Sequence, residues 1–423
     1  MSEMIRGNCP HCGKPLEIPA ELEEFSCLYC GERMRTEILL APLKERLECS
    51  AEDMQYLREK LAAAALNYPD YYKKFRCIAD KCPDTCCSDW QIVIDDESLE
   101  KYRNYAGEYR QTLHRNIQWE EGVFGHNRKG KCAFLRDDGL CDMYKHMGKD
   151  SLCTTCREYP RHTEEFENIR EISLSLSCPE VARILMQKTD PVTFVCEEDD
   201  EEEVFEDYDY FLFSNLEDIR EEILKITQNR EESLKARIRK VLQIGASAQR
   251  HYEEGDLIDW DECEDTDKVC VKDEYELFRK HMRFLSEELE LLYQDWDDVL
   301  VESEVLLFDL GEAGFTENKK RFLSWWGNSS LPSLEIVLEQ IVVYFISIYL
   351  LGAVYDGNIL GKIDSAVGHV TVIFLLLLAR WIKCSEKLEM TDLIELVYRY
   401  SREIEHSDEN LDRVEELDWF IRI

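Results

Sequence analysis

Three features of the 423-residue sequence predict a mainly α-helical, multi-domain protein. Two cysteine pairs open the chain, nine further cysteines gather between positions 77 and 178, and apolar residues recur at helical spacing after position 211. We therefore expect a small N-terminal zinc ribbon at 1–36, a connecting helix at 37–70, an irregular, metal-bound cysteine-rich domain at 71–190 and a helical domain at 191–423.

The zinc-ribbon prediction rests on two C-x2-C pairs, each followed by glycine. Cys9 and Cys12 form the first pair, Cys27 and Cys30 the second, with fourteen residues between the pairs. Four thiolates at this spacing are typical of a tetrahedral zinc site. Because all four ligands come from the protein and no position stays open, we expect a structural zinc rather than a catalytic one.

The segment after the ribbon predicts a helix. Leucines between positions 43 and 66 recur near helical spacing, and a run of alanines at 62–65 favours the same structure. The residues Asn67-Tyr68-Pro69-Asp70 are expected to stop this helix and to mark a domain boundary.

The nine central cysteines are better explained by metal than by disulfides. The chain begins without the charged and apolar pattern of a signal peptide, so we expect a cytoplasmic protein, in which thiols stay reduced. Thiolates are ligands for zinc or for iron–sulfur clusters, and nine exceed the four that one centre needs. Either two centres exist, or some cysteines are structural. The nine are Cys77, Cys82, Cys86, Cys87, Cys132, Cys141, Cys153, Cys156 and Cys178.

The remainder of the chain predicts helices joined by acidic linkers. An acidic run at 197–209 separates the cysteine-rich domain from segments with helical periodicity. The two longest apolar runs, at 341–354 and 370–379, are shorter than the roughly 18 apolar residues that a membrane span needs. We expect both to be buried core helices and predict no membrane span.

The net charge of -38 bears on the class of partner. An acidic protein is a poor ligand for a phosphate backbone, so nucleic acid is not expected. A lysine-bearing protein surface would be attracted to it, although the same charge also serves solubility alone.

No motif locates a nucleotide or a methyl donor. The turn at 310–315 lacks a G-x-G-x-x-G run and the strand–helix alternation of dinucleotide-binding folds. The C-x3-C-x2-C spacing of radical enzymes is incomplete, because Asp89 stands where the third cysteine would be.

The cysteine region as a whole resembles the flagellin lysine N-methylase family. The resemblance is strong to about position 190 and loose beyond, and residues 1–35 lie outside it. Its segments are 75–77, 82–90, 132–135, 139–144, 152–153, 159–162, 173–183 and, near the C-terminus, 398–407.

This resemblance implies a cytoplasmic enzyme that transfers a methyl group from S-adenosylmethionine to lysine side chains of flagellin or of another lysine-bearing protein. It also implies an iron–sulfur cluster, of the 4Fe–4S type, on the cysteines. A broader group of zinc- or iron-chelating proteins shares a reduced pattern, which here corresponds to Cys82, Cys86, Cys87, Cys132, Cys141 and Cys156. An alternative is a metal-dependent protein-binding module or scaffold without enzymatic activity.

Methyl transfer to lysine requires a group that removes a proton from the amine, whose ordinary pKa is about 10.4. Carboxylate, tyrosine and histidine side chains within the resembling segments are candidates, and the alternative for each is a structural role. Tyr144 and Glu405 belong to this wider set. The residues that we predict to be catalytic are Asp89, Tyr159, His162 and His406.

Overall fold

The computed structural model describes residues 4–8, 14–19, 24–26, 33–35, 65–88, 90–128, 130–166, 169–198, 209–255, 274–293, 295–417 and 419. The chain divides into two compact units. One comprises residues 1–65 with 198–203, and the other comprises residues 66–197 with 204–423. The prediction of a multi-domain, mainly helical protein agrees with this division and with the element order along the chain.

The first unit contains two short antiparallel hairpins. Strand β1 (Met4–Asn8) pairs with β2 (Pro15–Pro19), and β3 (Glu24–Ser26) pairs with β4 (Arg33–Arg35). In sequence, one predicted cysteine pair falls between the two strands of each hairpin. The four cysteines themselves, Cys9, Cys12, Cys27 and Cys30, lie outside the described residues, so the zinc site stays a prediction.

A four-stranded sheet in the order β10–β5–β9–β8 belongs to the second unit. Its members are β5 (Ala65–Pro69), β8 (Arg161–Phe166), β9 (Ile169–Leu174) and β10 (Phe194–Glu198). Strands β8 and β9 are antiparallel, with Arg161 opposite Leu174. β5 replaces the end of the predicted connecting helix, because Tyr68 is buried and the backbone pairs with two neighbouring strands. The earlier part of that helix lies outside the described residues.

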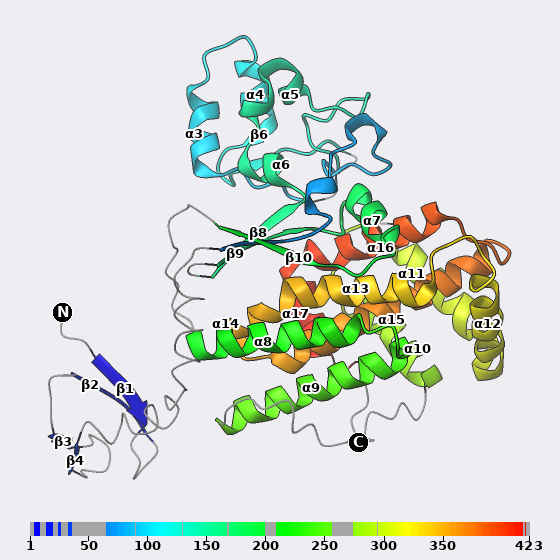
Figure 1. Ribbon diagram of the computed structural model, residues 1–423. Helices are drawn as coiled ribbons and strands as arrows, with labels where there is room; N and C mark the ends of the chain where they lie inside the picture. Colours follow the sequence, from blue (N-terminus) through cyan, green and yellow to red (C-terminus); the bar gives the residue numbers. More distant parts are fainter. Residues whose placement is uncertain are drawn as a thin grey trace. The chain divides into compact units, whose positions relative to one another are not determined.

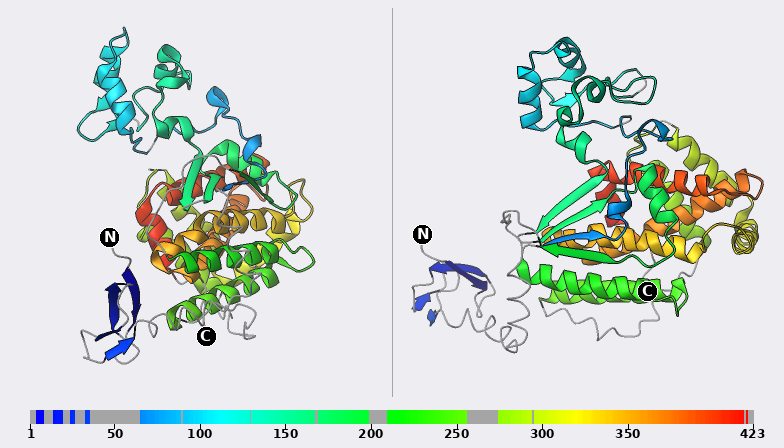
Figure 2. Two further views of the ribbon diagram at one scale, coloured as in Figure 1. Left: turned by 60° about the vertical axis from the view of Figure 1, so that its left-hand side comes forward. Right: turned by 45° about the horizontal axis from the view of Figure 1, so that its top comes forward.

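The cysteine-rich segment consists of short elements around a small apolar core. Its elements are η1 (Tyr72–Lys74), η2 (Ala79–Lys81), α3 (Asp96–Asn104), α4 (Arg110–Asn116), β6 (Ile117–Gln118), β7 (Val123–Phe124), α5 (Asp142–Met147), η3 (Lys149–Ser151) and α6 (Thr154–Glu158). Tyr102, Leu113 and Phe124 are almost fully buried there. The segment therefore has an apolar core of its own, and its binding of metal stays a prediction. In both views of Figure 2 the cyan part with α3 and α4 lies apart from the helical body.

The remaining chain is helical, as predicted. The body consists of α7 (Pro179–Met186), α8 (Tyr210–Thr227), α9 (Leu234–Glu254), α10 (Glu274–Glu287), α11 (Trp296–Phe308), α12 (Gly311–Trp326), α13 (Leu334–Tyr349), η4 (Leu350–Gly352), α14 (Ala353–Asp356), α15 (Ile359–Lys383), α16 (Met390–Glu405) and α17 (Asp408–Glu416). Helices α8, α9, α13 and α15 pack side by side (Figure 1). The predicted turn at 310–315 is instead the start of α12, and a helix rather than a strand precedes it, so it is not a nucleotide-binding loop.

Helix α15 is the centre of this body. It contacts α9, α11, α12, α13, α16 and α17, and most of its side chains are buried. The stretches Leu334–Asp356 and Ile359–Lys383 are long and apolar enough to cross a membrane, which corrects the view that the apolar runs are too short. Their most apolar windows are 67% and 83% buried inside the protein, as in core helices.

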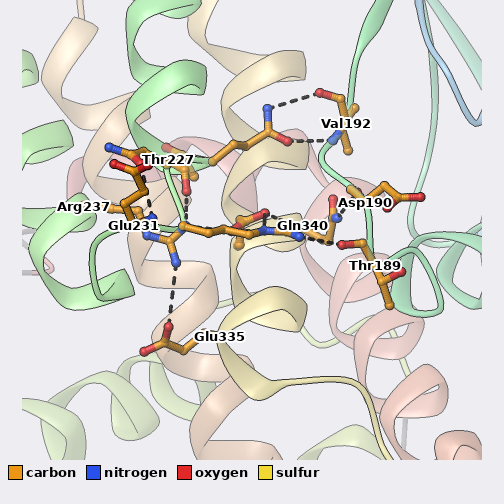
Figure 3. A network of polar contacts seen from close by, with 12 residues as sticks. Thr189, Asp190, Val192, Thr227, Glu231, Arg237, Glu335 and Gln340 are labelled. Carbon is orange, nitrogen blue, oxygen red and sulfur yellow. Dashed lines mark hydrogen bonds and ion pairs between the residues drawn. The ribbon is translucent and has the colours of Figure 1, made fainter.

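A buried network of charges fixes α9 and α13 to the segment that follows α7 (Figure 3). Glu339 on α13 is fully buried and accepts hydrogen bonds from Arg237 at 2.6 Å and from Arg230 at 2.8 Å. Arg230 also donates to the carbonyl of Thr189 at 2.7 Å, and Gln340 donates to the carbonyl of Asp190 at 2.9 Å. These contacts hold the chain between α7 and β10 against the helices.

Candidate functional site

The C-terminal end of α16 meets the cysteine-rich segment through Arg402. This side chain is 1% exposed, and its Nε donates to the carbonyl of Ser177 at 2.8 Å. Its Nη2 donates to the carbonyl of Asp84 at 3.0 Å, and its Nη1 lies 2.7 Å from the Asp84 carboxylate. One guanidinium thus joins the first cysteine loop to the last, because its planar fork can serve several acceptors at once.

Three rings gather beside this arginine. Trp90 lies 5.1 Å from His406 and 5.8 Å from Tyr159, and Tyr159 lies 6.2 Å from His406, as distances between ring centroids. The indole of Trp90 donates to the carbonyl of Cys86 at 2.6 Å, which connects the rings to the cysteine doublet. The structure therefore brings together two of the predicted catalytic residues, Tyr159 and His406.

The protonation states of these two residues follow from their surroundings. Burial, assisted by the charge of Arg402, lowers the pKa of His406 to about 4, so its imidazole is neutral near pH 7. Its Nδ1 is buried and has no hydrogen-bond partner among the described residues. Burial raises the pKa of Tyr159 well above its ordinary value, so its phenol keeps its proton.

The other predicted catalytic residues are placed differently. His162 lies on β8 with its side chain 55% exposed and pairs with Glu164, which raises the pKa of the imidazole. Tyr144, from the wider set of candidates, is 50% exposed on α5. Asp89 lies outside the described residues. The sequence therefore located one part of the site and not a complete catalytic group.

Glu405, the neighbour of His406, is a buried carboxylate surrounded by hydroxyl groups. Tyr344 donates to its Oε2 at 2.6 Å and Ser175 to the same oxygen at 3.3 Å, while Ser401 and Tyr349 also donate to the carboxylate. Burial raises its pKa, and these four hydrogen bonds oppose that rise.

Several of the predicted metal-ligating cysteines occupy positions that favour a thiolate. Cys141, Cys153 and Cys178 are the N-cap residues of α5, α6 and α7, where the nearby backbone amides act to lower the pKa of each thiol. The amide of Phe134 does the same for Cys132. Burial nevertheless raises the pKa of Cys132, Cys141 and Cys178 overall.

In two pairs of neighbouring cysteines the interaction between the thiols moves their pKa values in opposite directions. The interaction of Cys86 with Cys87 lowers the pKa of Cys87 to about 7 and raises that of Cys86. Likewise the interaction between Cys153 and Cys156 lowers the pKa of Cys153 and raises that of Cys156. One thiol in each pair is thus prepared to lose its proton, which binding to a metal requires.

Electrostatic interactions divide the nine cysteines into two groups. The five-thiol group, which packs against the small core of the cysteine-rich segment, comprises Cys87, Cys132, Cys141, Cys153 and Cys156. The four-thiol group, beside α7 and Arg402, comprises Cys77, Cys82, Cys86 and Cys178. The doublet Cys86-Cys87 connects the groups, and the six cysteines of the reduced pattern are distributed over both.

These groups have the donor chemistry of a thiolate-bound centre, with soft sulfur ligands and backbone amides near several of the thiols. In the part of the chain that the structure describes, however, no three Cys, His, Asp or Glu side chains lie close enough together to hold a metal ion. The residues therefore fit such a centre by type and by neighbourhood. Ligation would require the thiols to move closer together.

The fold and the site together define a helical protein in which the C-terminal end of α16 contacts the cysteine-rich, or thiol-rich, segment. The model of the FliB lysine N-methylase C-terminal domain matches residues 220–418. The flagellar biosynthetic protein FliU of Salmonella muenchen is 31% identical over 131 residues, which cover 29% of this chain and 77% of that protein. The chain belongs to the FliB lysine N-methylase family.

Two further relatives are the lysine-N-methylases of Salmonella typhimurium and Salmonella choleraesuis. Each is 31% identical over 131 residues, which cover 29% of this chain and 32% of the relative. The match thus spans about a third of the length of these two enzymes. No solved structure matches the chain.

Proposed function

We propose that this protein is a cytoplasmic protein-lysine N-methyltransferase that uses S-adenosylmethionine and acts on flagellin. The observation that carries the proposal is the 31% identity to FliU over 77% of that protein. The match of residues 220–418 to a lysine N-methylase domain supports it, because this range includes α16 and the end that contacts the thiol-rich segment.

Methyl transfer to lysine requires a group that accepts a proton from the lysine ammonium. The lysine amine forms a bond to the methyl carbon while the bond from that carbon to sulfur breaks, and the electron pair returns to sulfur. Before this step the ammonium must lose a proton, since only the free amine has a lone pair. As acceptors we propose the neutral imidazole of His406, whose ring lies against Tyr159, and the carboxylate of Glu405, to which Ser175 donates.

The surface charge supports a lysine-bearing substrate. A net charge of -38 attracts a cationic side chain over long range and accelerates its encounter with the enzyme. The same charge offers no support for nucleic acid as a partner.

We further propose an iron–sulfur cluster on the thiol-rich segment and a structural zinc on Cys9, Cys12, Cys27 and Cys30. The five-thiol group is the first candidate for the cluster, because it contains both N-cap thiols of α5 and α6 and the low-pKa thiol of Cys87. A bound cluster would supply a Lewis-acidic or redox-active centre. Whatever its role, the segment's own residues position Tyr159 and Trp90 against His406.

The test is methylation of flagellin from the same source by anaerobically purified protein and labelled S-adenosylmethionine, with methyl-lysine detected by mass spectrometry. We expect methylation by the wild type, no methylation by a folded Cys156→Ser variant, and full activity in the control Cys384→Ser, whose thiol is exposed at the end of α15. Equal activity of Cys156→Ser would remove the cluster from the mechanism. No methylation by cluster-loaded wild type would instead favour the protein-binding module.

A further inference from the structure

A continuous chain of hydroxyl groups connects Glu405 to Tyr159. Glu405 Oε2 lies 3.3 Å from the hydroxyl of Ser175, which lies 2.5 Å from that of Ser177. The hydroxyl of Ser177 in turn lies 2.9 Å from the phenol of Tyr159. In the last two contacts either oxygen can donate, so the direction of all the bonds can reverse together.

The two ends of this series of hydroxyl groups, Glu405 and Tyr159, lie in different surroundings. At one end Glu405 is buried among hydroxyl donors, and among the described residues no lysine, arginine or histidine forms an ion pair with it. At the other end Tyr159 packs against Trp90 and His406, beside the thiol-rich segment. A carboxylate that lacks a cationic partner is stabilised by accepting a proton. The series of hydroxyl groups therefore has a proton acceptor at its Glu405 end.

We propose that Glu405, Ser175, Ser177 and Tyr159 form a proton relay that removes the proton from the substrate amine and stores it on Glu405. This inference rests on the proposed lysine methyltransferase function. As the phenol oxygen of Tyr159 accepts a proton from the lysine ammonium, its own proton moves to Ser177. The proton of Ser177 moves to Ser175, and that of Ser175 moves to Glu405. The products are a neutral amine and a carboxylic acid, and the methyl sulfonium donor then reacts with the amine.

The surroundings of Glu405 suit storage of a proton. Burial raises its pKa above the ordinary value and so favours the acid form, whereas the hydroxyl donors stabilise the carboxylate that must accept the proton. Ser401 precedes Glu405 by one turn of α16 and His406 is the C-cap residue of that helix, whereas Tyr344 and Tyr349 come from α13 and Ser175 follows β9. The titratable side chains in its electrostatic range are Tyr71, His162, Tyr344, Tyr349 and Tyr400.

The relay is tested by the pH profile and the solvent isotope effect of methylation. Activity of the wild type should fall at acid pH as Glu405 becomes protonated. Methylation should also be slower in D2O than in H2O, because more than one proton moves in the same step. In Glu405→Gln and Ser177→Ala we expect kcat to fall by about a hundredfold, the range of general base catalysis. The pH profile of Glu405→Gln should no longer show the fall in activity at acid pH. Ser177→Thr, which keeps a hydroxyl group, should recover the activity that Ser177→Ala loses.

Glu403→Gln is the matched control, since Glu403 is another buried glutamate of α16 whose carboxylate faces the amides of Leu292 and Tyr293 instead. Its kcat, pH profile and isotope effect should equal those of the wild type. If Glu405→Gln and Ser177→Ala show wild-type profiles and isotope effects, the relay is wrong and the methyltransferase stands. If wild type transfers no methyl group, both proposals fall together.

Discussion

Arg402 and Asp84, which are 318 positions apart in the sequence, form an ion pair of 2.7 Å at the junction of the helical body and the thiol-rich segment. The same arginine also donates to the carbonyl of Ser177, so it joins two segments that are far apart in the sequence. It also lies over the ring of Tyr398, 5.2 Å from the centroid. The position of the cysteine loops and the protonation of their thiols therefore depend on contacts with α16.

The first prediction concerns this arginine. Arg402→Ala leaves a carboxylate and two carbonyls without their donor, so we expect a loss of about 3–5 kcal/mol in the free energy of unfolding and faster amide exchange at 82–88 and 175–178. Denaturant unfolding and hydrogen-exchange mass spectrometry measure both. Arg413→Ala, which removes an exposed pair with Glu409, should cost less than about 1 kcal/mol. Equal effects of the two changes would contradict the role of Arg402.

The second prediction concerns the buried glutamate of the helical body. Glu339→Gln removes the countercharge of Arg237, a side chain that is 2% exposed, and we expect the free energy of unfolding to fall by about 3–5 kcal/mol. The matched control is Glu304→Gln, which removes a partly exposed partner of Arg283 and should change stability by less than about 1 kcal/mol. Urea unfolding of both variants gives the comparison. A Glu339→Gln protein as stable as wild type would show that the network of Figure 3 is replaceable.

The sequence predicted the helical body well because its signal is local. Apolar residues at helical spacing define α8, α9 and α15, and Pro179 marks the start of α7. Within the segment predicted to be irregular, two short helices form, α3 and α4, separated where Tyr105 is extended. Strand β5 was missed since its structure depends on pairing with strands that come about 100 residues later or more.

The site was predicted only in part, for a related reason. The motifs around Tyr159 and His406 could be recognised one by one, but their contact depends on how α16 packs on α7. Arg402 and Ser177 lie inside segments that resemble the family and were not singled out. No local signal marks Arg402, because polar and charged residues such as Ser401 and Glu403 surround it in the sequence, and its burial depends on how α16 packs.

The third prediction is a pH dependence of stability from Glu403. This side chain is 3% exposed, and burial raises its pKa from 4.5 to about 7. Between these values the folded protein keeps a proton that the unfolded chain releases, so the stabilisation is complete below pH 4.5 and is lost as pH rises to about 7. We expect the free energy of unfolding, relative to Glu403→Gln, to fall by up to about 1.4 kcal/mol per pH unit in that range. Chemical denaturation across it gives the two curves, and parallel curves would contradict the shift.

The fourth prediction concerns the N-terminal cysteines. The double variant Cys9→Ser, Cys27→Ser removes one ligand from each pair, so we expect it to lose about one zinc per chain, because a tetrahedral site needs all four. Iron content should not change. Metal analysis of purified protein measures both, and Cys196→Ser, an exposed cysteine of β10, is the control that should keep all metal. Unchanged zinc in the double variant would contradict a ribbon site.

The last prediction separates the two thiol groups. Cys153 belongs to the five-thiol group and Cys178 to the four-thiol group, and each is the N-cap residue of a helix. If the five-thiol group holds the cluster, Cys153→Ser should abolish the iron, the sulfide and the visible absorbance, because a cluster needs about four thiolates. Cys178→Ser should keep them and lose at most a second metal. The control Cys384→Ser should keep everything. Loss of the cluster in Cys178→Ser with retention in Cys153→Ser would assign it to the four-thiol group, and loss in both variants would mean that one centre draws on the two groups through the doublet Cys86-Cys87.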